Sequence, residues 1–151
     1  PKNIVVANRS TPRLDECKKI NEEFYPNTIP AEYFLTPDPG QNDDVMAKEM
    51  GEGSLIINAT GLGKDRPGSP LTDAAQFPKK AIVWEINYRG ELTFMHQAEA
   101  QEKEKELDIQ DGWMYFVYGW TQVMADVFHC ELLGEKLQKL SEIAREVQSR
   151  K

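Results

Sequence analysis

The sequence predicts an α/β domain built around a largely parallel β-sheet. Three short apolar runs rich in β-branched residues, at 4–8, 54–60 and 81–87, have the pattern of strands buried on both faces. Segments whose apolar residues recur at helical spacing lie between and after these runs. Strands that alternate with helices are typical of α/β domains. The length of 151 residues corresponds to about one domain.

The first half of the chain alternates strand and helix. After the strand at 4–8, Ser10 or Thr11 can cap a helix, and Pro12 suits its first position. The apolar residues of that helix are Leu14, Cys17, Ile20 and Phe24. We expect the helix to end at 25–27, before a short strand at 32–35, a turn at 36–40 and a brief helix at about 43–50.

The second half begins with the strand at 54–60, followed by a Gly- and Pro-rich loop and a short helical turn near 72–77. After the strand at 81–87 we expect a helix over 91–106 and a last strand at 107–109. The apolar segment 113–128 contains Gln122 and Asp126 and is followed by His129, which favours a buried helix over a membrane span. A terminal helix then carries one apolar stripe, formed by Leu133, Leu137, Leu140, Ala144 and Val147.

The composition disfavours several classes of function. A mean hydropathy of −0.59 leaves no room for a membrane span. With 18 basic and 25 acidic side chains the net charge is −7, which disfavours a nucleic-acid partner. Cys17 and Cys130 have no Cys-x-x-Cys companion, so neither a disulfide scaffold nor a metal site is predicted. We expect a cytoplasmic protein, and a chain that starts within a domain because an apolar strand follows Pro1 almost at once.

The strongest local feature is the segment Asn8-Arg9-Ser10-Thr11-Pro12-Arg13 at the carboxyl end of the first strand. Ligands of doubly wound sheets bind at this end, and an arginine there in place of an acidic residue accommodates the 2′-phosphate of NADP. Arg9 and Arg13, with the Ser10 hydroxyl and the N–H groups of a helix start, form a small anion site. The segment therefore favours NADP over NAD. Two solvated arginines at a helix start are the alternative explanation.

A second polar loop, at 58–63, follows the next strong strand. Gly61 and Gly63 would let the backbone approach a ligand closely, although a strand-to-loop turn without a ligand explains them as well. His96 and His129 have no metal-ligand neighbour at helical spacing and are predicted to be surface or packed residues. If Gln122 is buried, it needs a polar partner. A hydrogen bond within the core explains a glutamine at this position as well as a functional role does.

Taken together, these motifs resemble the C-terminal, NADP-binding domain of shikimate dehydrogenases. Residues 4–13 are similar to the strand and NRT-x-x-R/K phosphate-recognition motif of that family, and residues 57–63 to its nicotinamide-side loop. Further features follow in the family's order over roughly residues 4–128: SPL at 69–71, a strand that leads to Tyr88, and Asp111-Gly112 before an apolar helix. The resemblance implies reduction of 3-dehydroshikimate to shikimate with NADPH on a Rossmann-like doubly wound sheet.

The resemblance also implies roles for particular residues. Asn8, Arg9, Ser10 and Arg13 would hold the adenosine 2′-phosphate and ribose of NADP. Thr60 and Gly61 would lie along the nicotinamide half, and the Gly112 carbonyl would meet the carboxamide. Tyr88 would touch the substrate. Gln122 is the candidate for the family's substrate-binding glutamine, which lies seven residues after the glycine, whereas Gln122 lies ten after Gly112.

Two parts of the family pattern have no counterpart here. The Gly-rich pyrophosphate loop with its preceding strand, and the catalytic Lys and Asp of an N-terminal substrate domain, do not occur in this chain. We therefore expect an incomplete nucleotide-binding part at 1–110, C-terminal helices at 111–151, and no catalytic residue, so that the chain is inactive without its N-terminal part. The absent strand would leave two edges about 9–10 Å apart. A noncatalytic nucleotide-binding or interaction domain, and a quinate or other polyol-acid dehydrogenase, are the alternatives.

Overall fold

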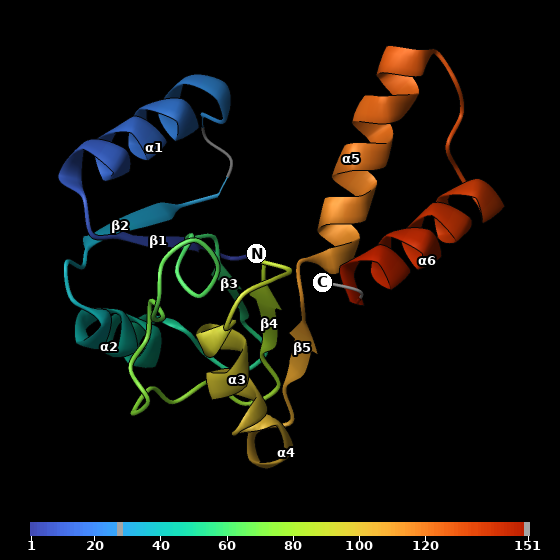
Figure 1. Ribbon diagram of the computed structural model, residues 1–151. Coiled ribbons are helices and arrows are strands. Elements are labelled where there is room, and N and C mark those ends of the chain that lie inside the picture. The colour runs from blue at the N-terminus through green and yellow to red at the C-terminus, as the bar shows by residue number, and fades with distance from the viewer. Residues whose placement is uncertain (27–28, 150–151) are drawn as a thin grey trace.

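The computed structural model describes residues 1–26 and 29–149 and has the predicted α/β architecture (Figure 1). The first helix ends before Tyr25 as expected, and Asn27, included in its predicted end, lies outside the described residues. The strands are β1 (Ile4–Asn8), β2 (Ala31–Leu35), β3 (Leu55–Asn58), β4 (Ile82–Glu85) and β5 (Asp108–Gln110). The helices are α1 (Thr11–Phe24), α2 (Pro39–Glu49), α3 (Thr93–Glu99), α4 (Glu102–Lys105), α5 (Trp113–Phe128) and α6 (Glu135–Ser149).

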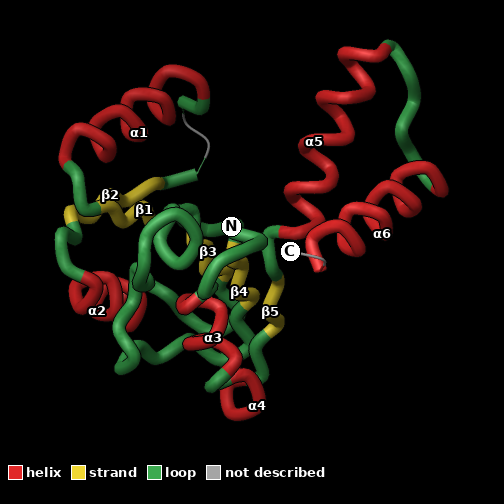
Figure 2. The backbone as a smooth tube through the Cα atoms, viewed as in Figure 1, coloured by secondary structure: helices red, strands yellow, loops and turns green. Residues whose placement is uncertain are grey.

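The strands pair in parallel and form two separate sheets (Figure 2). In the first sheet β1 pairs with β2, from Ile4 opposite Ala31 to Asn8 opposite Leu35. In the second sheet β4 lies between β3 and β5. A complete doubly wound sheet has the strand order 3-2-1-4-5-6, and β2, β1, β3, β4 and β5 match positions 3, 2, 4, 5 and 6. The fold is therefore Rossmann-like and incomplete, because no strand among the described residues takes the position between β1 and β3.

The main core covers one face of the second sheet. Along β4, Val83 and Glu85 are fully buried, whereas Ile82 points to the opposite face and is 43% exposed. The buried apolar residues are Met46, Leu71, Ala75, Phe77, Ala81, Val83, Phe94, Ala98 and Leu107. On the opposite face Leu55 and Ile57 of β3 are also exposed. The second sheet therefore has one packed face and one open apolar face.

The helix bounds differ from the prediction at α2. This helix starts at Pro39 and not near residue 43, because Asp38 serves as its N-cap and the Asp38 N–H donates to Gln41 Oε1 at 3.1 Å. Proline at the first helical position adds to this early start. A capping signal in the turn-rich segment thus extends the helix toward the N-terminus by about one turn.

The predicted helical turn near 72–77 is a single turn, closed by the Ala75 N–H and the Thr72 carbonyl at 3.2 Å. The Thr72 N–H donates to Asp43 Oδ1, and Pro78 disfavours helical geometry at the residue before it. The predicted helix at 91–106 divides into α3 and α4. Gln101, between them, accepts from the Phe77 N–H and donates to the Ala75 carbonyl, so a long-range contact replaces helical continuity.

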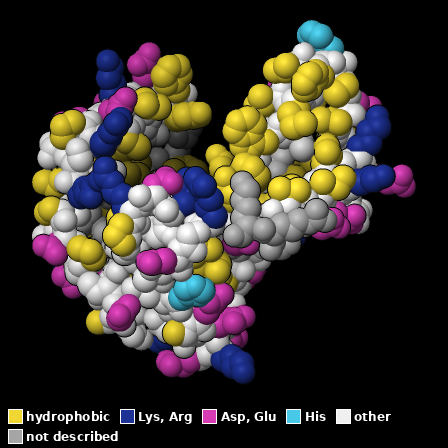
Figure 3. All heavy atoms as spheres, in the orientation of Figure 1, with side chains coloured by type: hydrophobic (Ala, Val, Ile, Leu, Met, Phe, Trp, Pro, Cys, Tyr) yellow, Lys and Arg dark blue, Asp and Glu magenta, His cyan; other side chains and the backbone are white. Residues whose placement is uncertain are grey.

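The prediction that residues 113–128 form a helix is confirmed, but the prediction that this helix is buried is wrong. The helix exists as α5, but only Trp113, Val117 and Thr121 of it are buried. Together with α6 it forms a hairpin that projects from the sheets (Figure 1). Hydrophobic side chains gather along this hairpin, with a hollow between it and the rest of the molecule (Figure 3). The apolar stripe of α6 is buried only at Leu137, so most of the apolar surface of the hairpin remains uncovered.

Candidate functional site

The residues predicted to form a site follow the carboxyl ends of four parallel strands. Asn8 ends β1 and is followed by Arg9 and Ser10, Thr60 and Gly61 follow β3, Tyr88 follows β4, and Gly112 follows β5. Carboxyl ends of parallel strands lie at one edge, where doubly wound sheets bind their ligands. The structure brings the residues after β3, β4 and β5 together, whereas those after β1 belong to the other sheet.

The same local turn ends the two strands that border the open position. Asn8 Oδ1 accepts a hydrogen bond from the Ser10 N–H at 3.0 Å, and Asn58 Oδ1 accepts one from the Thr60 N–H at 3.0 Å. An asparagine side chain that binds the backbone two residues on turns the chain sharply at a strand end. Both turns present a polar loop at the edge where a ligand would lie.

The two arginines after β1 differ in their surroundings. Arg13 lies in the first turn of α1 and forms an exposed ion pair with Glu16, with 2.9 Å between Nη1 and Oε2. Arg9 is exposed and has no ion pair with any described residue. Ser10 is the N-cap of α1, and its side chain makes no capping hydrogen bond. Arg9 and Ser10 therefore lie beside a helix N-terminus with polar atoms available to an anion.

A buried polar network joins the ends of β3 and β4, and it depends on a residue that the sequence analysis missed. Glu85 is fully buried and accepts from Asn58 Nδ2 at 2.7 Å on one oxygen. Its other oxygen accepts from the Asn87 N–H at 2.9 Å and from Asn87 Nδ2 at 2.7 Å. Asn87 Nδ2 also donates to the Thr60 carbonyl at 3.0 Å. The sequence signal that could have identified Glu85 is the presence of an acidic residue within an otherwise apolar strand.

The surroundings of Glu85 shift the pKa of its carboxyl in two opposite directions. Burial raises the pKa of the Glu85 carboxyl above its ordinary value, and the hydrogen bonds from Asn87 and Asn58 offset part of that rise. Each of these bonds favours the carboxylate, which can only accept. The network therefore uses both carboxylate oxygens of a side chain that water does not reach.

Close backbone packing fixes the loops around this network. A Cβ on Gly112 would lie 1.7 Å from the Ile86 carbonyl oxygen, and one on Gly90 would lie 2.2 Å from that of Gly63. The Gly112 N–H donates to the Asn87 carbonyl at 3.1 Å. Only glycine permits these approaches. They hold the start of α5 against the end of β4, and the loop after β4 against the loop after β3.

Tyr88 is held by the start of α5. Its ring stacks on Phe116 with 4.1 Å between the ring centroids and meets Trp113 edge-to-face at 6.2 Å. Trp113 and Val117 are buried, and the Tyr88 and Phe116 rings pack against them. The position of Tyr88 is thus set by aromatic packing at the carboxyl edge of the second sheet.

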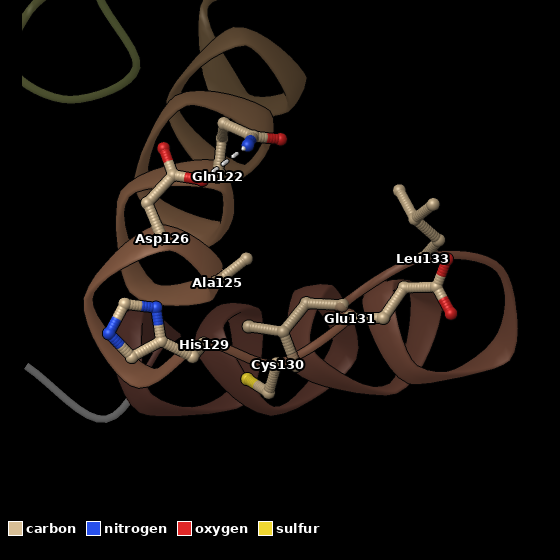
Figure 4. A pocket seen from close by; sticks show the side chains of 8 residues that line it. Gln122, Ala125, Asp126, His129, Cys130, Glu131 and Leu133 are labelled. Atoms are coloured by element: carbon tan, nitrogen blue, oxygen red, sulfur yellow. Dashed lines mark hydrogen bonds between the residues drawn. The ribbon is translucent and has the colours of Figure 1, made fainter.

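Gln122 does not lie beside Tyr88 in the structure. It lies about 9 Å farther along α5 than Phe116, since the helix rises about 1.5 Å per residue. Gln122 Nε2 donates to Asp126 Oδ1 at 3.0 Å, and both line an open cavity of about 520 Å³ near the α5–α6 turn (Figure 4). His129 and Cys130 border the same cavity.

The described residues contain no group of three or more His, Cys, Asp or Glu placed to hold a metal ion. His96 is exposed and lies 2.7 Å from the Glu99 carboxyl, and His129 ends α5 in a left-handed conformation. Within the same ranges, no helix has the length and apolarity that crossing a membrane would require.

Two curated proteins similar to this chain are named shikimate dehydrogenase (NADP(+)). The chain is 31% identical over 106 residues to that of Lactococcus lactis subsp. cremoris strain MG1363 and 30% identical over 106 residues to that of strain SK11. Each match covers 70% of this chain and 36% of the relative. No family model matches the chain, and no solved structure matches it significantly. The chain is therefore similar to shikimate dehydrogenases over about a third of their length.

Proposed function

We propose that this chain is the NADP-binding portion of a shikimate dehydrogenase-like oxidoreductase, which interconverts 3-dehydroshikimate and shikimate in the cytoplasm. The similarity to two proteins of that name carries the proposal. An incomplete Rossmann-like sheet with polar loops at its carboxyl edge supports it independently. When bound, NADP would supply or accept the hydride.

The residues after β1 fit the adenosine half of NADP. Arg9 has no ion pair within the described residues and would bind the 2′-phosphate, for which guanidinium geometry is well suited. Asn8 and Ser10 would contact the ribose, and Arg13 would exchange its exposed contact with Glu16 for the phosphate. An exposed ion pair is weak, so little free energy opposes that exchange.

The residues of the second sheet fit the nicotinamide half. Thr60 and Gly61 would lie along the cofactor, and the Gly112 carbonyl would accept from the carboxamide. Tyr88, fixed by Phe116, would reach the substrate from this domain. Gln122 would contact the substrate only if the substrate domain closes over α5, because it now lies with Asp126 beside another cavity.

We further propose that the catalytic groups and the central strand come from polypeptide outside residues 1–151. The open strand position between β1 and β3 supports this, as does the 36% share of each relative that the match covers. Unpaired apolar strand edges are unstable in isolation.

The test is spectrophotometric. The protein that contains this chain together with its N-terminal part should reduce NADP in the presence of shikimate and prefer NADP to NAD. Purified residues 1–151 alone should show neither turnover nor a cooperative melt as a monomer. Turnover by the isolated chain would refute the proposal that the catalytic groups come from polypeptide outside residues 1–151. Absence of NADP binding and turnover in the longer protein would favour a noncatalytic domain, and turnover with quinate alone would identify a different polyol-acid substrate.

A further inference from the structure

Glu85 occupies an unusual place for a carboxylate. It is fully buried, it lies between the ends of β3 and β4, and its hydrogen-bond partners are Asn58 and Asn87, with no ion pair to a described cation. A buried carboxylate without a cation is costly and is kept only where several donors satisfy it. None of the proposed cofactor or substrate contacts uses this side chain.

The carboxylate determines which way the neighbouring amide of Asn58 points. Because the carboxylate only accepts, Asn58 must turn its Nδ2 group toward Glu85. Asn58 Oδ1 then faces the Thr60 N–H at 3.0 Å and the Thr60 hydroxyl at 2.7 Å. Thr60 Oγ1 in turn accepts from the Leu62 N–H at 3.2 Å. The orientation of one amide thus propagates through three hydrogen bonds into the loop after β3.

Glu85 orients the amide of Asn87, which follows β4, in the same way. With its Nδ2 group on Glu85, Asn87 also donates to the carbonyls of Thr60 and Leu62, at 3.0 and 3.3 Å. The Asn87 carbonyl accepts from the Gly112 N–H at 3.1 Å. The loop after β3, the end of β4 and the start of α5 are therefore all connected to a single buried side chain.

We propose that Glu85 is a positioning residue whose carboxylate, by orienting the Asn58 and Asn87 amides, fixes the loop at 60–62 for binding the nicotinamide half of the cofactor. The connection to the cofactor rests on the proposed function, whereas the orientation of the loop does not. The essential property is the acceptor character of both oxygens, and not the negative charge as such.

The test exchanges donor and acceptor between two contacting side chains. Glu85→Gln places an NH₂ group against donors, whichever way its amide turns. In the double variant E85Q/N58D the amide introduced at position 85 can donate to the carboxylate introduced at position 58, which still accepts from the Thr60 N–H and hydroxyl. In the protein that carries this chain and its N-terminal part, we expect E85Q to speed amide hydrogen exchange at Thr60 and Leu62 and to weaken NADP binding, each by about 10-fold. The double variant should recover most of both losses.

The matched control is Glu52→Gln, which removes an exposed carboxylate paired with Lys80 and should leave both measurements unchanged. Unchanged exchange at Thr60 and Leu62 in E85Q would overturn the proposal. So would a double variant that exchanges or binds no better than E85Q. If E85Q does not fold, a folded double variant supports the proposal and an unfolded one overturns it. If the wild-type protein binds no NADP, the proposed function fails, while the exchange measurement still decides the role of Glu85.

Discussion

Replacing Gly112 by alanine should strongly destabilise the protein, because the start of α5 has no room for a side chain. The added Cβ would lie 1.7 Å from the Ile86 carbonyl oxygen, whereas Cβ contacts essentially never fall below 3.0 Å. The backbone must then move by about 1.3 Å (3.0 − 1.7), which breaks the bond from the Gly112 N–H to the Asn87 carbonyl. Overpacking costs about 1–3 kcal/mol and the lost hydrogen bond about 0.5–1.5 kcal/mol. We expect a total of about 1.5–4.5 kcal/mol.

The assay is thermal unfolding of the protein that carries this chain and its N-terminal part. At roughly 2–4 °C per kcal/mol, a loss of about 1.5–4.5 kcal/mol lowers the Tm by about 3–18 °C. Gly119→Ala is the matched control, since Gly119 lies inside α5 and an added Cβ there would meet no atom within 4 Å. Alanine stabilises a helix interior by about 1 kcal/mol over glycine, so the Tm should rise. A G112A Tm equal to that of wild type would refute the packing argument.

Three further predictions concern the site. Arg9→Ala should weaken NADP binding by about 1.5–3 kcal/mol and NAD binding far less, as measured by titration calorimetry, and an equal loss for both would show that Arg9 does not bind the 2′-phosphate. Tyr88→Phe should raise the KM for shikimate or lower kcat while the cofactor Kd stays constant, and unchanged kinetics would leave Tyr88 with a packing role only. Because burial raises the pKa of Glu85 above 4.5, its contribution to stability should be full below pH 4.5 and be lost as the pH rises through the folded-state pKa. Urea unfolding at a series of pH values should show this loss in wild type, and its persistence in Glu85→Gln would assign it to another group.

Three of the strands, β1, β3 and β4, were predictable because each is a short apolar run. The expected burial on both faces is wrong, since Leu55, Ile57 and Ile82 are exposed on the open face of the second sheet. The split between α3 and α4 was not predictable, since Gln101 binds backbone groups of residues 75 and 77, and helical spacing carries no information on such contacts. The burial of α5 was overestimated for a related reason. Apolar composition shows that a helix needs a partner surface, but the described residues supply one only near Trp113 and Val117.

The positions of Arg9 and Gly112 directly after strand ends were predictable from the sequence, and their roles in binding stay predictions. Glu85 was missed because the strand at 81–87 was identified from its apolar residues, and the single acidic residue within it was not considered. A single acidic residue within such a run must find donors when it is buried, and the nearby Asn58 and Asn87 are the residues that provide them. Pairing buried carboxylates with nearby asparagines would have found the network, although not the exposed setting of Gln122.

The open strand position and the exposed apolar surfaces have one common explanation. Leu55 and Ile82, on the open face of the second sheet, line a cavity of about 470 Å³ together with Tyr115 and Tyr118 of α5. Trp84 and Tyr115 also line this cavity and meet edge-to-face with 5.8 Å between the ring centroids, so the sheet and the helix already touch there. Exposed apolar surface next to an unpaired strand edge marks a surface for further polypeptide. In parallel sheets a strand is followed by a crossover helix that covers one sheet face, so one strand between β1 and β3 with its helix would pair both edges and cover this apolar face together.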